Sequence, residues 1–148
     1  MPTTVWQEST RQELLARAAR VTPESARKWG RMTAPQMLAH VVDALKMTLG
    51  EVRIAPRRGP LRFPPLRHAI IHWLPFPRGA PTAPELISRS PTDCAEEVET
   101  LHRLLEAFAS RRRDGDWPEH PAFGRLTGDD WGVLVYRHTD HHFRQFGV

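Results

Sequence analysis

One stretch of this 148-residue chain is rich in proline, which limits where long helices or strands can form. Nine of the fourteen prolines lie between residues 51 and 91, at positions 56, 60, 64, 65, 75, 77, 81, 84 and 91. Proline lacks the amide donor and breaks helix interiors. We therefore predict a long irregular connection here, with one short helix at "LRHAIIHWL", residues 66–74. Such a connection in a compact domain is usually functional or a crossover.

Four longer segments outside this connection carry the apolar spacing of helices, and no segment shows the alternation of a strand. The first is "STRQELLARAARV", residues 9–21. The second is predicted to begin at Thr33, which has Gln36 three residues later and so forms a capping box. It runs to Gly50, a C-terminal stop, and its apolar stripe includes His40.

The third helix is predicted from about Thr92 to Arg112, with apolar residues at the alternating spacing of a bundle seam. Thr127 is predicted to cap the last helix, with Asp130 at its third position. Short links favour antiparallel neighbours, and a long crossover permits a parallel pair. These features predict an all-α fold, an up-down-down-up four-helix bundle with a long Pro-rich crossover between its second and third helices.

The charge of the chain argues against a nucleic-acid partner, although the net charge is +4. Its basic residues are spread out and mixed with acids, whereas a DNA-binding domain concentrates them on one face. The apolar stretch "AIIHWLPFP" is too short to span a bilayer, so we expect no membrane partner. The first ten residues do not resemble a signal peptide, and a single cysteine permits no internal disulfide. We therefore expect a cytoplasmic protein.

Three of the eight histidines cluster in "YRHTDHHFRQFGV" at the end of the last helix. At about 100° per residue with His138 at zero, His142 falls at about 40° and His141 at about −60°. Trp131 at about 20° and Gln145 at about −20° share the face of the first two. His138 and His142 are thus predicted on the core side, with His141 at its edge. Two histidines at i and i+4 on one helical face can share a metal ion.

His40 is the candidate third ligand, because it also lies mid-helix on a core stripe. Three neutral imidazoles from two helices would leave a coordination position open for water or substrate. Zinc, nickel, copper or iron accept such ligands, and we expect zinc or nickel. The alternative is a set of satisfied core histidines, but burying three of them without partners would cost several kcal/mol. Asp43, one turn after His40, is the candidate acceptor for an imidazole N–H, or a base.

The remaining histidines and the cysteine have simpler interpretations. His68 and His72 share the four-residue spacing, but we assign them to the short linker helix, with metal binding as the less favoured alternative. His102 lies off the apolar stripe and is expected in solvent, and His120 is either a cap or a pocket-lining residue. Cys94 is expected as a packed core thiol rather than a reactive one.

These motifs resemble the DinB-like superfamily, whose members carry a terminal His-x-x-x-His followed by a basic residue and Gln. The corresponding residues here are His138, His142, Arg144 and Gln145. The segments "WGRMTAPQMLAH", "LPFPRGAPTAPEL" and "HPAFGRLTGDDW" resemble one uncharacterised bacterial branch, and the resemblance runs from about Trp29 to the end. The ending "HHFRQ" differs from the usual "HHRGQ", because the basic residue is displaced by one position.

The resemblance implies a single four-helix bundle domain over residues 1–148, with a divalent metal held by His40, His138 and His142. Several relatives are transferases that use low-molecular-weight thiols such as bacillithiol or mycothiol, others are mycothiol-dependent isomerases, and homodimers are common. The function expected from it is a metal-dependent thiol transferase or hydrolase that acts on a small molecule.

The pocket and the catalytic residues are less defined by the sequence. Trp73, His120, Tyr136 and Arg144 are candidates for lining the pocket, and no general base is identified. A non-catalytic metal- or ligand-binding protein, or a structural one, is therefore the alternative function. A basic nucleic-acid binder is a third and weaker one.

Overall fold

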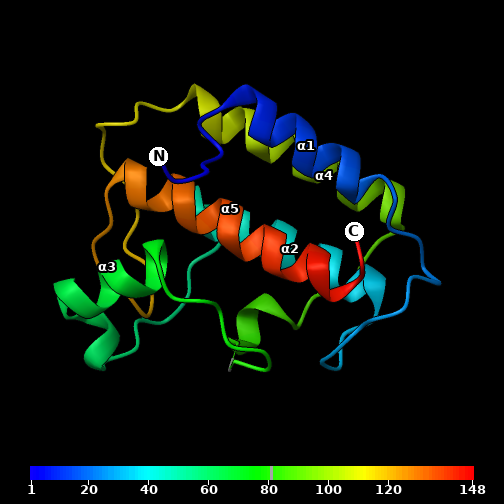
Figure 1. Cartoon of the computed structure of the whole chain (residues 1–148), viewed down its shortest axis with the longest axis horizontal. Helices are drawn as coiled ribbons and strands as arrows, with labels where there is room; N and C mark the ends of the chain where they lie inside the picture. The colour runs from blue at the N-terminus through cyan, green and yellow to red at the C-terminus, as the bar shows by residue number, and fades with distance from the viewer. Residues whose placement is uncertain (81) are drawn as a thin grey trace.

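The computed structural model describes residues 1–80 and 82–148, and in these ranges the chain is helical and has no β-strand (Figure 1). The α-helices are α1 (Glu8–Ala18), α2 (Ala34–Thr48), α3 (Pro64–His72), α4 (Cys94–Ser110) and α5 (Gly128–Gln145). Two 3-10 helices, η1 (Pro60–Arg62) and η2 (Pro84–Leu86), lie in the Pro-rich connection. Pro81, one of its nine prolines, lies outside the described residues. The all-α prediction is confirmed.

Side-chain caps start the two helices that carry the candidate ligands. The Thr33 side chain accepts a hydrogen bond from the amide of Gln36, whose own side chain accepts one from Thr33. Thr127 and Asp130 form the same reciprocal box at the start of α5. Gly50, with φ +82°, follows the end of α2 in the left-handed region that favours glycine. The predicted caps of α2 and α5 are therefore confirmed.

Other helix ends differ from the prediction by two or three residues, and the largest difference is in α1, which ends at Ala18 and not at Val21. α4 begins at Cys94 and not at about Thr92, and Asp93 caps it by accepting from the amide of Glu96. The same helix ends at Ser110, because Arg111 is already extended with ψ 155°. The short linker helix begins at Pro64 and not at residue 66, since proline is well suited to the first turn of a helix.

The helices pack around one buried core. α2 lies against α4 and α5, α1 lies against the same two helices, and α3 lies against α5 (Figure 1). The largest fully buried side chains are those of Trp131, Phe108 and Phe143. Cys94 is buried too, and burial, followed by the charge of Asp93, raises the pKa of its thiol. The predicted packing of this thiol in the core is therefore confirmed. None of the described helices is both long and apolar enough to cross a bilayer.

The segment that precedes α1 lies along α5. Val5 is fully buried, and its amide donates to the carbonyl of Gly132 at 3.2 Å. The Trp6 indole donates to the carbonyl of Gly128 at 2.8 Å, and its ring packs on Phe108 with centroids 4.6 Å apart. The close approach depends on Gly132, where a Cβ would lie 2.4 Å from the Thr4 hydroxyl and 2.5 Å from the Trp6 ring.

We therefore expect Gly132→Ala to destabilise the protein by about 1–3 kcal/mol, because the added methyl must displace the segment before α1. The result is informative because alanine is otherwise the better helix former by about 1 kcal/mol. Urea unfolding measures the change. Gly59→Ala is the matched control, since a Cβ there meets nothing within 4 Å. A Gly132→Ala protein as stable as wild type would show that residues 4–6 do not pack on α5.

Candidate metal centre

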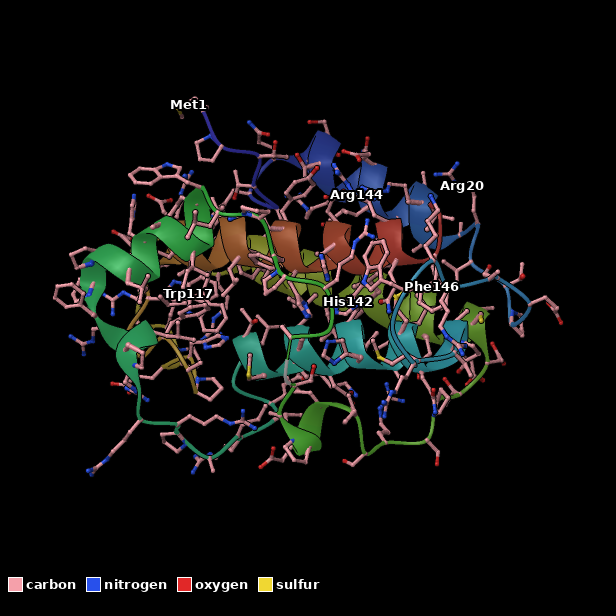
Figure 2. All side chains as sticks on the ribbon, turned by 60° about the horizontal axis from the view of Figure 1, so that its bottom comes forward. Met1, Arg20, Trp117, His142, Arg144 and Phe146 are labelled. Carbon is pink, nitrogen blue, oxygen red and sulfur yellow. The ribbon has the colours of Figure 1, made fainter. Side chains whose placement is uncertain are left out.

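Three histidines from α2 and α5 meet in the interior. One ring nitrogen from each of His40, His138 and His142 lies within 4.8 Å of those of the other two. The ring centroids are 4.9 Å apart for His40 and His138 and 4.7 Å for each of the other two pairs, and all three pairs are edge-on. Figure 2 shows His142 on the side of α5 that faces α2. The structure thus brings together the three residues that the sequence singled out.

The ring of His40 is oriented by the Pro-rich connection. Its Nδ1 lies 3.0 Å from the carbonyl oxygen of Leu86, at the end of η2. A carbonyl only accepts, so Nδ1 carries the proton and Nε2 presents a lone pair. That Nε2 lies 3.0 Å from Nε2 of His138. His40 is 2 % exposed, so the lone pair lies away from bulk solvent.

Two consecutive hydrogen bonds, both made by Gln145, orient the ring of His142. The side-chain amide nitrogen of Gln145 donates to the carbonyl of Trp29 at 2.9 Å, which fixes the direction of the amide. The Gln145 Oε1 therefore faces Nδ1 of His142, at 2.9 Å. Since this oxygen only accepts, Nδ1 of His142 carries the proton and its Nε2 is left as a lone pair.

Burial keeps all three imidazoles neutral at neutral pH. It lowers the pKa of His40 below its ordinary value, against the hydrogen bond to Leu86. It holds the pKa of His138 well below that value, with further lowering by His142 and His40. It also lowers the pKa of His142 to about 3. Neutral imidazole is the form that binds a metal ion.

Two further histidines adjoin the triad without joining it. His141 is half-buried, and its ring lies 5.5 Å from that of Trp29 and 5.9 Å from that of Phe76, centroid to centroid. This agrees with its predicted place at the edge. His120 accepts at Nδ1 from the amides of Ala122 and Phe123, so it caps its turn. Burial lowers the pKa of His120 to about 4.

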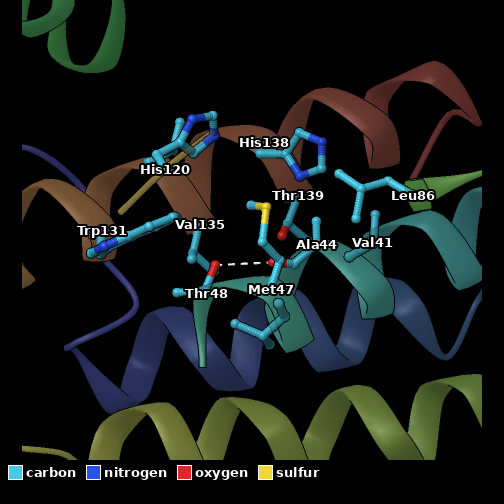
Figure 3. A pocket seen from close by; sticks show the side chains of 12 residues that line it. Val41, Ala44, Met47, Thr48, Leu86, His120, Trp131, Val135, His138 and Thr139 are labelled. Carbon is cyan, nitrogen blue, oxygen red and sulfur yellow. Dashed lines mark hydrogen bonds between the residues drawn. The ribbon is translucent and has the colours of Figure 1, made fainter. Parts of the chain in front are cut away.

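Two cavities border the triad. One of about 80 Å³ is lined mainly by apolar side chains together with His120, Trp131 and His138 (Figure 3). The other, of about 180 Å³, is lined by His40, Arg31, Gln36 and neighbouring residues of α2 and of the Pro-rich connection. His120 is therefore both a cap and a pocket-lining residue. Each cavity is wide enough for a few waters or one group of a small ligand.

Of the other candidate site residues, Asp43 lines the cavity beside His40, but it does not hold the imidazole. Asp43 accepts from Arg89 at 3.0 Å, and the imidazole N–H it was expected to bind is turned to Leu86 instead. Trp73 is 72 % exposed at the end of α3. Tyr136 lines neither of the two cavities.

The side chain of Arg144 is exposed and pairs with Asp140 at 2.9 Å, on the side of α5 away from His142 (Figure 2). Of the four pocket candidates, only His120 borders the triad.

Sequence reasoning missed the groups that orient the ligands. The carbonyls of Leu86 and Trp29 belong to irregular segments whose backbone path no periodicity predicts. Gln145 did leave a signal, because it falls on the same helical face as His138 and His142 although it is polar. A polar residue on an apolar stripe must find a buried partner, and here it finds two.

Comparison with known proteins assigns most of the chain to a family. A family model described as a protein of unknown function, DUF1569, covers residues 12–147. That span includes the triad, both cavities and the Pro-rich connection, and it excludes residues 4–6, which pack on α5. Neither the curated proteins nor the solved structures contain a match.

Proposed function

Since this chain belongs to the DUF1569 family of proteins of unknown function, we propose its function from the site alone: it binds a divalent metal ion through His40, His138 and His142. The observation that carries the proposal is the convergence of three neutral imidazoles, two of which, His40 and His142, have their proton positions set by acceptors outside the triad. Such outer hydrogen bonds orient metal-bound histidines in proteins generally.

The donor set fits a zinc or nickel ion. Three imidazole nitrogens are ligands of intermediate softness, which suit these metals better than magnesium or calcium. The Nε2 atoms of His40 and His138 are 3.0 Å apart, so a small rotation of either ring would make room for an ion between them. Three protein ligands leave a position open for a water molecule or for the substrate.

We further propose a small-molecule transferase or hydrolase, with a low-molecular-weight thiol as the preferred substrate class. A metal ion in the triad would supply Lewis acidity, which lowers the pKa of a bound water or thiol. The chain itself would contribute three neutral imidazoles, two of them oriented by outer hydrogen bonds, and a cation. Arg31 lines the cavity beside His40, where a guanidinium suits the carboxylate of a small thiol.

The alternative function is a metal site without turnover, or a ligand-binding or structural protein. It is favoured by the small volume of the cavity beside His138, about 80 Å³, and by its mainly apolar lining. A metal ion would then stabilise the contact between α2 and α5 and catalyse nothing. A nucleic-acid partner has no support from the site.

We also propose that the chain is a member of the DinB-like superfamily with an up-down-down-up bundle. The course of the chain in Figure 1 supports this, because α1 and α5 run one way and α2 and α4 the other. The Pro-rich connection then serves as the crossover between α2 and α4. A homodimer, a single domain over the whole chain and a cytoplasmic location remain predictions.

Cobalt substitution tests the proposed function. Tag-free protein, stripped with a chelator and reloaded with Co²⁺, is expected to show the visible bands of a four- or five-coordinate histidine site. Added 2-mercaptoethanol is expected to produce a sulfur-to-cobalt charge-transfer band, because the open position accepts a thiolate. Ethylene glycol, which has nearly the same size and lacks the sulfur, is the control ligand.

Each outcome of this experiment decides between the functions. A thiol band that is present in wild type and absent in His138→Ala supports a thiol-dependent enzyme at the triad. Visible bands that are lost in His138→Ala and do not respond to thiol favour the non-catalytic metal site. A protein whose spectrum is unchanged by Co²⁺ contradicts the metal centre itself.

A further inference from the structure

A second group of metal-ligand side chains lies where α3 meets the start of α5. His68 and His72 are one turn apart on α3, and Asp130 is in the first turn of α5. One ligand atom from each lies within 4.8 Å of those of the other two. The site is separate from the triad, and it shares no residue with it.

The carboxylate of Asp130 is held in place by its role as a helix cap. Its Oδ2 accepts from the amide of Thr127 at 3.1 Å and from the hydroxyl of the same residue at 2.9 Å. Its Oδ1 points the other way, to Nε2 of His72 at 2.9 Å. The helix cap therefore occupies one oxygen of this carboxylate, and the other oxygen faces α3.

The two histidines offer a pair of ligands on one face of α3. Their ring centroids are 4.3 Å apart with 31° between the planes, as the i and i+4 positions of a helix allow. His68 is exposed, and the ring it packs against, that of Trp73 with centroids 5.0 Å apart, is itself exposed, so the imidazole can turn toward an ion without opening the core. The hydrogen bond between His72 and Asp130 does not involve His68, whereas a metal ion could bind all three side chains.

The site is preorganised by contacts that do not involve its own residues. The Arg137 guanidinium, on α5, donates to the carbonyl of Ile70 at 2.8 Å, to that of Ile71 at 2.6 Å and to that of Leu74. The Ile71 side chain is fully buried. These contacts fix α3 on α5, so the ligands face one another before any ion arrives. Ligands that are fixed in advance lose less entropy on binding.

We propose that His68, His72 and Asp130 bind a second divalent ion of the zinc class, which ties the Pro-rich connection to the beginning of α5. Two imidazoles and one carboxylate are a common ligand set for such ions, and water completes the coordination at this partly exposed position. The ion would replace the hydrogen bond between His72 and Asp130. The proposal is independent of the triad and of any catalysis there.

Zinc stoichiometry in single-histidine variants tests this proposal. Tag-free, chelator-stripped wild type, His68→Ala and His102→Ala are equilibrated with zinc at a free concentration held low by a chelating buffer, and bound zinc is quantified by mass spectrometry. We expect His68→Ala to hold about one equivalent less than wild type, because a two-ligand site binds far more weakly. His102→Ala, which also removes an exposed histidine, is expected to bind as much as wild type.

A second variant tests the same site through a different proposed ligand, Asp130. Asp130→Asn keeps the size of the capping side chain, and it is expected to lose the same equivalent as His68→Ala. Circular dichroism of both variants checks that they are folded. If both are folded and bind as much zinc as wild type, the second site is contradicted, whatever the triad binds, since the triad's equivalent is lost separately in His138→Ala.

Discussion

His138→Ala protein, produced without a histidine tag, is expected to retain about one equivalent of metal less than wild type, since a site of three histidines binds far more weakly after losing one of them. Nε2 of His138 lies 3.0 Å from that of His40, and its ring centroid is 4.7 Å from that of His142. The two imidazoles left behind would bind as weakly as an isolated pair. Mass spectrometry of the purified proteins measures the difference.

His141→Ala is the matched control for this prediction. His141 is next to His142 in the chain, but its ring packs against Trp29 and Phe76 and is outside the triad. We expect this variant to keep the full metal content of wild type. Equal metal contents in wild type and His138→Ala, after reconstitution with zinc and with nickel, would contradict the triad.

The second large effect is expected at Arg89, which pairs with two buried carboxylates. It donates to Asp43 on α2 at 3.0 Å and to Glu97 on α4 at 2.6 Å, and those side chains are only 7 % and 3 % exposed. Arg89→Met would remove the cation that pairs with Glu97 and would leave Asp43 only its longer pair with Lys46, at 3.8 Å. Removing one partner of a buried ion pair typically costs about 3–5 kcal/mol, so we expect a loss of that size at neutral pH.

The pKa of Glu97 determines how the stability loss of Arg89→Met should change with pH. Burial alone would raise the pKa of Glu97, but hydrogen bonds from Arg89 and Thr92 outweigh it and hold the pKa below its ordinary value. In wild type the ionised Glu97 therefore stabilises the fold above its unfolded pKa, and this stability is lost as the pH falls through the folded pKa. In Arg89→Met the carboxyl pKa rises, so protonation relieves the penalty in acid.

Urea unfolding at pH 7 and at about pH 4 measures both parts, since unperturbed glutamates titrate near the lower value. The difference between Arg89→Met and wild type is expected to shrink at the lower pH. Arg103→Met, an exposed site on α4, is the control and should change stability by no more than about 0.5 kcal/mol. A small loss at pH 7, or one that grows in acid, would contradict the buried ion pairs.

Much of the frame that positions the triad was predictable from local sequence. The caps at Thr33 and Thr127 depend on residues three positions apart, which a linear reading captures. The inward faces of His40, His138 and His142 follow from helical periodicity, since each lies on an apolar stripe. Helices place residues by a fixed rotation, so side chains a hundred residues apart could be assigned to one interior.

The partners of those side chains were not predictable in the same way. Asp43 was expected to accept a hydrogen bond from an imidazole N–H. Its donor is instead Arg89, in the irregular connection, because a charged guanidinium binds a carboxylate more strongly than a neutral imidazole does. The segment around Val5 was not assigned to the core, although it lies along α5, because no periodic pattern precedes α1. Contacts made by irregular backbone depend on the three-dimensional path of the chain, which local propensity does not encode.

The carbonyl of Leu86 that orients His40 has a consequence for how this family can diverge. Every amino acid carries the same backbone acceptor, so replacing Leu86 alters the bulk at that position and leaves the acceptor in place. Insertions or deletions between α3 and η2 would move it. Distant members could therefore differ in sequence between α3 and η2 and still orient the imidazole in the same way, provided that the length and course of this segment are inherited.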